Sequence, residues 1–182
     1  MKKDILHLQE INPERRVVLM AFFTAFAIMI YILESFIPKP MPFLKLGLAN
    51  IVVLLLLGSG YPWSALIVTV SKTLLGGLLS GTFLSPGTLL SLGGSLTAFL
   101  VMSVAIQEFF GFSLIGVSIC GAVAHNLGQL IVARMIVIKQ DSIFCLTPFM
   151  ILVGIATGIM IGLMTIVFRK AIEKKVSNEV LG

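Results

Sequence analysis

Apolar runs of membrane-spanning length follow one another along almost the whole sequence, and this feature limits the possible folds most strongly. A helix that crosses the hydrocarbon core of a bilayer needs roughly 20 mostly apolar residues. Of the 182 residues, 58% are hydrophobic and only 12% are charged, and a soluble domain of this length could not bury so much apolar surface. The runs are continuous rather than alternating, which argues against a β-barrel.

The runs predict an all-α integral membrane protein whose six transmembrane helices form one bundle. The second expected span is short, and the fifth is long enough to tilt or to include the end of a loop. Residues 17–168 then form a single membrane domain between an N-terminal segment, 1–16, and a C-terminal tail, 169–182. The expected spans are Val17–Ile37, Leu44–Leu57, Trp63–Leu79, Leu89–Gln107, Phe112–Ile138 and Pro148–Phe168.

Basic residues in the short connecting segments predict the orientation, because cytoplasmic loops carry an excess of Lys and Arg. Six spans place both termini on one side of the membrane. That side holds Lys2, Lys3, Arg15, Arg16, Arg169, Lys170, Lys174 and Lys175, whereas the opposite loops hold Lys39, Lys45 and Lys139. We therefore expect a plasma-membrane protein with both terminal segments in the cytoplasm. This bias accounts for most of the net charge of +5, so the charge does not indicate nucleic-acid binding.

Lys72, in the third expected span, is the polar residue whose position most needs an explanation. It lies about 14 Å into the span at 1.5 Å per residue, where inserting a lysine costs roughly 2.5–3.5 kcal/mol. Both ends of the span are distant for a snorkelling side chain, so a partner or a polar cavity must hold the ammonium. The other polar side chains expected within the bundle are Glu34, Asn50, His125, Asn126 and Gln129.

These polar side chains have two interpretations. Each amide could simply bond to a neighbouring helix, a contact worth about 0.6 kcal/mol on average, and His125 alone is more readily read as a satisfied core residue than as a ligand. Taken together, they could line a pocket in the outer half of the bundle, whose donors suit an anionic or carbonyl-rich small ligand. The set predicts a substrate-binding site of Lys72, Asn50, His125, Asn126 and Gln129, with Glu34 either paired with Lys72 or placed at the mouth.

The loop "SGTFLSPG" (80–87) predicts a lid over that pocket. It contains glycines and a Pro-Gly pair, which interrupt helical structure, and mobile loops of this kind close on a ligand. The same glycines could equally make room for packing and a turn. The predicted lid residues are Gly81, Thr82, Phe83, Ser85, Pro86 and Gly87.

Small residues recur every fourth position in three of the expected spans. Such stripes let two helices approach closely within a membrane, either inside the bundle or against a separate membrane subunit. We expect the stripe of the first span to dock a partner, because it lies in the cytoplasmic half. The stripes are Ala21 with Ala25, Ala124 with Gly128, and Gly154 with Gly158 and Gly162.

Motifs for catalysis are absent from the sequence. There is no P-loop, no acidic cluster of the kind that holds magnesium for prenyl diphosphate chemistry, no Ser-His arrangement and no CxxC. Cys120 and Cys145 lie at different depths, which makes them poor disulfide partners, and their spacing does not suit a metal. We therefore expect neither an enzyme nor a resident metal or cofactor.

Three segments of the chain resemble one known family. They are "KLGLANIVVLLLL" (45–57), "LLGGLLSGTFLSPGTLLSLGG" (74–94) and "FSLIGVSICGAVAHNLGQLIVA" (112–133), of which "GAVAHNLGQL" is the most specific part. The resemblance is to the Gx transporter family, also labelled heptaprenyl diphosphate synthase component I, and covers about residues 17–168. That family is regarded as similar in fold to the substrate-binding S components of energy-coupling factor (ECF) transporters.

The resemblance implies a six-helix protein that binds a small nutrient from outside, through the loops after its first and third helices. It also implies docking onto a transmembrane T component and two ATPases, for which an Ala-x-x-x-Ala stripe on the first helix is typical. The leading hypothesis is therefore a substrate-capture subunit of an ECF-type transporter. One alternative is a scaffold of a flavin- or quinone-linked electron-transfer system, because genes of the family are also found near genes for such systems. The other is an accessory protein that handles prenyl chains.

Overall fold

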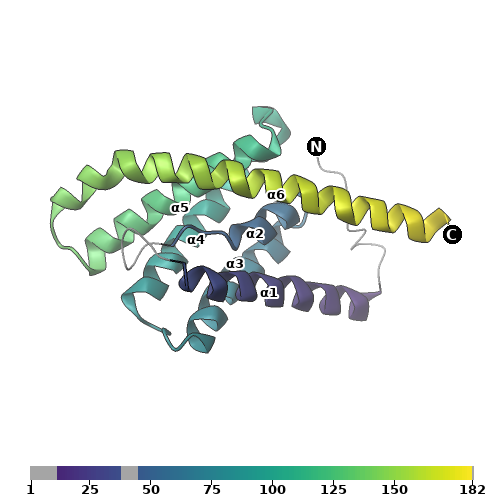
Figure 1. Cartoon of the computed structure of the whole chain (residues 1–182), viewed down its shortest axis with the longest axis horizontal. Helices are drawn as coiled ribbons and strands as arrows, with labels where there is room; N and C mark the ends of the chain where they lie inside the picture. Colours follow the sequence, from purple (N-terminus) through teal and green to yellow (C-terminus); the bar gives the residue numbers. More distant parts are fainter. Residues whose placement is uncertain (1–11, 38–44, 182) are drawn as a thin grey trace.

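The computed structural model describes residues 12–37 and 45–181, which form a bundle of α-helices (Figure 1). No β-strand occurs in this part of the chain. Two short 3₁₀ turns, η1 (Glu108–Phe110) and η2 (Asp141–Leu146), precede the last two helices. The helices are α1 (Pro13–Ser35), α2 (Asn50–Gly58), α3 (Pro62–Leu79), α4 (Pro86–Ala105), α5 (Leu114–Ile136) and α6 (Thr147–Leu181).

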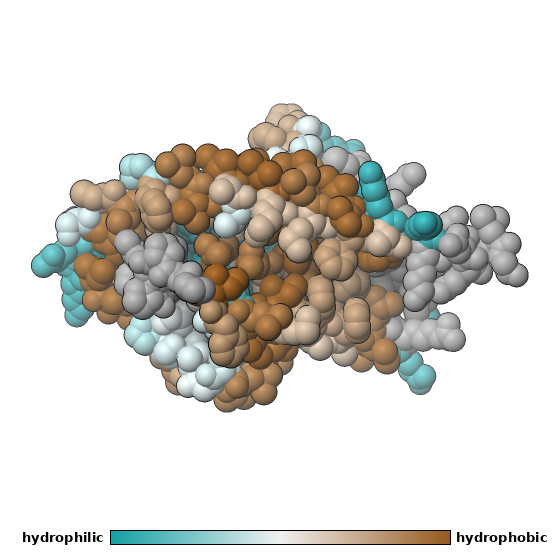
Figure 2. Space-filling view, in the orientation of Figure 1, coloured by the Kyte–Doolittle hydropathy of each residue, from teal (hydrophilic) through white to brown (hydrophobic). Residues whose placement is uncertain are grey.

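Five of the helical segments are long and apolar enough to cross a membrane. Large apolar side chains on their outward faces are exposed, among them Phe22, Leu100 and Leu163, and Figure 2 shows how widely such residues cover the visible face. An aqueous protein rarely exposes contiguous apolar surface on this scale, whereas lipid solvates it readily. The chain is therefore a multi-pass membrane protein.

The second predicted span, Leu44–Leu57, was wrong at its start. α2 has only nine residues, Asn50–Gly58, and rises about 13 Å at 1.5 Å per residue, so by itself it does not cross the membrane. Residues 45–49 are not helical, although Lys45, Gly47 and Ala49 are buried. All nine residues of α2 are buried, as expected for a helix that is apolar on every side and packs against α1, α3 and α6.

The last helix continues beyond the predicted span, Pro148–Phe168. α6 ends at Leu181, and its 35 residues correspond to about 52 Å of helix. That length exceeds the hydrocarbon core of a bilayer, about 30 Å. In Figure 1 the C-terminal part of α6 extends past the other helices.

Local sequence explains where the helices begin. Pro13, Pro62 and Pro86 each occupy the first turn of a helix, where the missing N–H has no intrahelical partner to lose. Ser85 caps α4 by accepting a hydrogen bond from the Thr88 N–H at 3.3 Å. As a result, Pro86 and Gly87 of the predicted lid belong to the first turn of α4 rather than to a loop.

The glycine stripe of α6 packs within the bundle. A Cβ atom on Gly154, Gly158 or Gly162 would come within 2.8, 2.6 or 2.9 Å of a backbone Cα atom of α5, so only glycine allows this approach. Gly128 of α5 lies equally close to α4, where its Cβ would be 2.6 Å from the Thr97 Oγ1. In both stripes the small residues therefore allow close packing inside the bundle rather than docking of a separate subunit. α5 lies between α4 and α6.

The two ends of the bundle differ in what they carry. We call the end where α1 stops and residues 45–49, 80–85 and 137–146 lie the distal end, and the end from which α1 starts and α6 projects the terminal end. In Figure 1 the distal end is on the left and the terminal end on the right.

Candidate ligand site in the distal half of the bundle

A buried, non-helical stretch of backbone, residues 45–49, forms the centre of the site. Polar backbone groups at membrane depth must find partners inside the protein, and here two side chains supply them. The Glu34 carboxylate accepts hydrogen bonds from the N–H groups of Gly47 at 2.8 Å and Leu48 at 3.1 Å. The Gln129 amide accepts from the Lys45 N–H at 3.2 Å and donates to the Lys45 carbonyl at 3.1 Å. We call residues 45–49 the re-entering segment.

Gly47 allows the re-entering segment to lie against the polar side chains. Its φ angle is +77°, a conformation that costs residues with a side chain roughly 1–2 kcal/mol. A Cβ at this position would also lie 2.9 Å from the His125 Cδ2 and 3.0 Å from the Asn50 Nδ2. Gly47 was not among the predicted site residues, although its place in "LGLAN" before a short apolar run is a signal that could have identified it.

Lys72 reaches this region from α3 and is only 1% exposed. Its ammonium donates a hydrogen bond to the Asn50 Oδ1, at the first position of α2. Glu34 and Lys45 are close enough to interact with it electrostatically, but Lys72 makes no ion pair with a carboxylate of the described residues. The hydrogen-bond partner of the buried cation is thus the neutral amide of Asn50.

Lys45 brings a second cation to the same region. Its ammonium lies 3.0 Å from the centre of the Tyr31 ring, a cation–π arrangement, and both residues are buried. The Tyr31 hydroxyl faces Ser91 and Thr88 of α4 without a hydrogen bond of normal geometry. Lys45 was predicted only as a loop cation that indicates orientation, and Tyr31 was not among the predicted site residues.

His125 is joined to the re-entering segment through Gln129. Because the Lys45 backbone fixes which end of the Gln129 amide is oxygen, the remaining amide N–H must donate to the His125 Nε2, 2.9 Å away. The imidazole is therefore neutral, with its proton on Nδ1. Backbone groups of Gly94 and Lys45 lie near the imidazole, but its Nδ1 has no hydrogen bond of normal geometry within the described chain.

Asn126 makes its hydrogen bond to a different helix. Its Nδ2 donates to the Met150 carbonyl of α6 at 2.9 Å, so the amide links α5 to α6, and its Oδ1 has no described partner. The structure therefore brings Lys72, Asn50, Glu34, Gln129 and His125 together around the re-entering segment. For Asn126 the contact favours the interhelical interpretation.

The predicted lid is a short, structured turn at the distal end. Gly81 and Leu84 have positive φ angles of +68° and +62°, and the Thr88 hydroxyl donates to the Thr82 carbonyl at 2.7 Å. Phe83 in the middle of the turn is exposed. The turn therefore lies on the surface between α3 and α4, and its closing over a ligand stays a prediction.

The Lys72 ammonium has no carboxylate partner among the described residues, since its hydrogen bond goes to the neutral amide of Asn50. Both Glu34 oxygens already accept backbone hydrogen bonds. An additional anionic group could therefore be accommodated electrostatically at the Lys72 ammonium, which has further N–H donors beyond the one given to Asn50.

Comparison with known proteins identifies the family. No curated protein and no solved structure matches the chain. The sequence profile of the heptaprenyl diphosphate synthase component I family matches residues 23–168, which include α2 to α5 and most of α1. The chain therefore belongs to the heptaprenyl diphosphate synthase component I family.

Proposed function

We propose that this protein is a substrate-capture subunit of an ECF-type transporter and takes up a small molecule with an anionic group. The ligand enters from the distal end, which faces the outside, and binds in the distal half of the bundle. Partner chains hydrolyse ATP, and this chain itself catalyses no reaction. The observation that carries the proposal is the buried Lys72 ammonium, whose hydrogen-bond partner is a neutral amide.

The energetic argument rests on the buried Lys72 ammonium, whose hydrogen-bond partner is neutral. A charge within the hydrocarbon region is tolerated when it faces a partner or a wet cavity, and an uncompensated buried charge is costly. A carboxylate or phosphate group on a ligand would offset the positive charge of Lys72. It would also accept the Lys72 N–H groups that Asn50 does not use.

The exposed alanine stripe of α1 supports a membrane partner. Ala21 and Ala25 are exposed, whereas the glycines of the α6 stripe are buried against α5. A small-residue stripe left uncovered allows another transmembrane helix to approach closely. This is the expected place for a T-type coupling subunit.

The test is to compare the wild type with Lys72→Met, which keeps a long side chain and removes its charge. Protein extracted gently from its native membrane should retain a small anionic molecule, identified by native mass spectrometry and by analysis of the released compounds. We expect Lys72→Met to lose that molecule while it inserts and folds normally. Lys139→Met, at an exposed position of the distal end, is the matched control and should retain it. Equal retention by Lys72→Met would contradict the proposal.

A scaffold role in an electron-transfer assembly is the second candidate, and one observation favours it. Glu34, Gln129 and Asn126 all bond to backbone groups of this chain, as purely structural side chains would. Purification of the native complex distinguishes the two roles. A T component with ATPases supports capture, a flavoprotein supports the scaffold, and a changed polyprenyl length on deletion would support the prenyl-handling role that the family label suggests.

A further inference from the structure

Exposed aromatic residues occupy the turn that joins α4 to α5. Residues 107–113 are all exposed, and within them Phe109 is 91%, Phe110 47% and Phe112 44% exposed. The Phe109 and Phe110 rings meet edge to face with 5.4 Å between their centroids, and those of Phe110 and Phe112 stack at 6.3 Å. We call residues 107–113 the aromatic turn. Its three rings form one apolar cluster outside the core of the bundle.

The length of α4 sets the depth of this turn in the membrane. α4 begins at the distal end, and its 20 residues rise about 30 Å, which equals the thickness of the hydrocarbon core, about 30 Å. α5 then runs back from Leu114. Figure 1 shows the turn, in teal-green, standing out from the side of the bundle. The aromatic turn therefore lies at the level where the acyl chains meet the lipid headgroups, on the terminal side.

The lipid-facing surface of α4 continues into the aromatic turn. Phe110 and Phe112 line one hollow together with Leu100, Val101 and Val104 of α4, and these three aliphatic side chains are exposed on a helix of membrane-spanning length. Lipid solvates such a surface readily, whereas water does not. Because the two rings border the same hollow, the lipid that covers this face of α4 also covers them.

Polar residues next to the rings oppose movement of the turn in either direction. Gln107 and Glu108 directly precede Phe109. Movement toward the bilayer centre would carry both polar side chains into hydrocarbon, which is costly. Movement outward would expose the rings to water, which is unfavourable for apolar surface. The combination of apolar and polar side chains is typical of segments that lie in the interface.

A second large aromatic residue lies at the same end of the bundle. Trp63, in the first turn of α3, is 78% exposed, as is typical of tryptophan at the boundary between membrane and water. Within the aromatic turn, Glu108 is the only charged residue, so the turn has no basic group that would select an anionic headgroup.

We propose that the aromatic turn inserts its phenylalanine rings between the headgroups and acyl chains of the leaflet at the terminal end, and that this insertion fixes the depth of α4 and α5 in the membrane. The partner is the phospholipid bilayer itself, without selection of one headgroup. The turn is separate from the ligand site in the distal half, and its insertion does not depend on the proposed transport function.

Depth-dependent quenching of a single tryptophan tests the insertion. Trp63 is the only tryptophan of the chain, so Trp63→Phe combined with Phe109→Trp leaves one fluorophore, in the turn. The full chain is reconstituted in phosphatidylcholine vesicles whose acyl chains carry bromine either near the carbonyl end or near the bilayer centre. We expect emission at shorter wavelength than that of tryptophan in water, and stronger quenching by bromine near the carbonyl end.

The control places the tryptophan deeper on the same helix. Leu100→Trp with Trp63→Phe, at a lipid-exposed position of α4, should be quenched relatively more by bromine near the bilayer centre. Emission from position 109 as in water, with quenching by aqueous iodide rather than by the brominated lipids, would overturn the proposal. The same bromine profile at positions 109 and 100 would also overturn it.

The Leu100→Trp reporter also tests whether the turn fixes the depth of the helices. Phe109→Ser with Phe110→Ser removes two rings from the turn, so we expect the reporter to move toward the headgroups and its quenching by bromine near the carbonyl end to increase. Phe109→Leu with Phe110→Leu keeps the turn apolar and should leave the profile unchanged. An unchanged profile in the serine variant would show that the turn does not set the depth.

A measurement in the native membrane distinguishes lipid from a partner protein. Benzoylphenylalanine in place of Phe109, at a position too exposed to affect folding, is activated by light in intact membranes. We expect it to attach to phospholipid. Attachment to another polypeptide would mean that a partner subunit covers the turn, and would overturn the proposal.

Discussion

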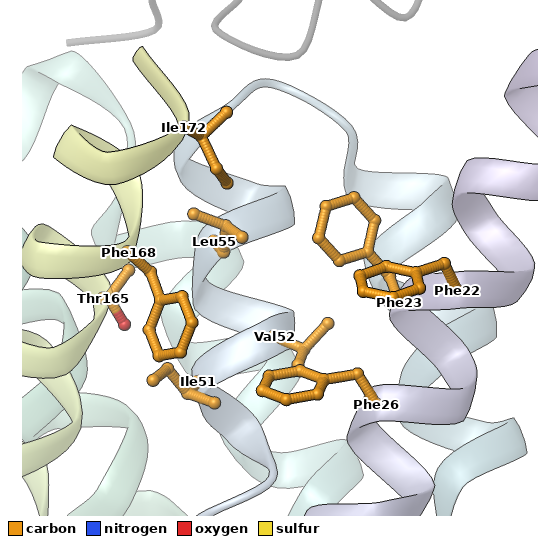
Figure 3. Close-up of a pocket in the computed structure, with 9 residues that line it drawn as sticks. All are labelled: Phe22, Phe23, Phe26, Ile51, Val52, Leu55, Thr165, Phe168 and Ile172. Atoms are coloured by element: carbon orange, nitrogen blue, oxygen red, sulfur yellow. The ribbon is translucent and has the colours of Figure 1, made fainter. Parts of the chain in front are cut away.

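The distal and terminal halves of this bundle are built from the same helices but carry different side chains between them, polar in the distal half and apolar in the terminal half. In the distal half, α1 contributes Glu34 and α2 begins with Asn50, and both side chains bond to groups of the protein. In the terminal half, the same two helices contribute apolar side chains to an open groove between α1 and α6 (Figure 3). The change occurs within one turn of α2, since Asn50 belongs to the site and Ile51 to the groove.

This difference shows what each half can tolerate. Polar groups of the distal half are buried, so a substitution there leaves a charge or an N–H group without a partner, at a high cost. Side chains of the terminal half contact apolar neighbours or lipid. When a substitution removes one of these contacts, lipid can supply another apolar contact in its place. We therefore expect distal substitutions to change stability strongly, and terminal substitutions to change mainly what the protein binds.

The largest effect is expected for Glu34→Ala. It leaves the Gly47 and Leu48 N–H groups unsatisfied and removes the carboxylate beside two cations, so we expect a loss of about 3–5 kcal/mol in unfolding free energy. Thermal unfolding in a mild detergent measures it. Glu34→Gln retains one carbonyl acceptor and should lose less. Glu14→Ala, an exposed carboxylate on the same helix, is the control and should change stability by less than about 0.5 kcal/mol; a similar loss in both alanine variants would contradict the structural role of Glu34.

A smaller loss is expected for Gly47→Ala. The positive φ angle and the contact with His125 together should cost about 2–4 kcal/mol. Gly60→Ala separates the two causes, because Gly60 has a φ of +89° but open space around its Cβ position. That control should lose only the strain, about 1–2 kcal/mol. Equal losses in the two variants, measured by the same thermal unfolding, would show that the re-entering segment does not pack tightly on the site.

Hydropathy alone was sufficient to predict the five long helices, because a membrane imposes both length and apolarity on them. The fifth expected span, Phe112–Ile138, differs from α5, Leu114–Ile136, by two residues at each end. The start of α2 could not be predicted in this way. The residues before Asn50 are apolar enough for a helix, but the carboxylate of Glu34 holds their backbone in another conformation, and that contact is not encoded in local hydropathy.

The sequence indicated which polar residues to consider for the candidate site better than it indicated the contacts that they make. A lysine at mid-depth required a partner, and Asn50 was among the few polar residues available to it. The bonds of Gln129 and Glu34 are to backbone groups, which have no signature in the sequence. Lys45 and Tyr31 were missed, since the first was counted among the loop cations that predict orientation and the second was not among the polar residues considered.

The smallest effect on stability is expected in the terminal half, for Ala21→Leu combined with Ala25→Leu. Both alanines are exposed, so the added methyl groups should extend into lipid and change the unfolding free energy by no more than about 0.5 kcal/mol. Gly158→Leu, in the buried stripe, should instead destabilise the protein, because its Cβ alone would lie 2.6 Å from a backbone atom of α5. Affinity purification from native membranes should recover partner chains with the wild type but not with the double leucine variant. A loss of stability equal to that of Gly158→Leu would mean that the alanine stripe packs inside the protein, and undiminished recovery of partners would mean that they bind elsewhere.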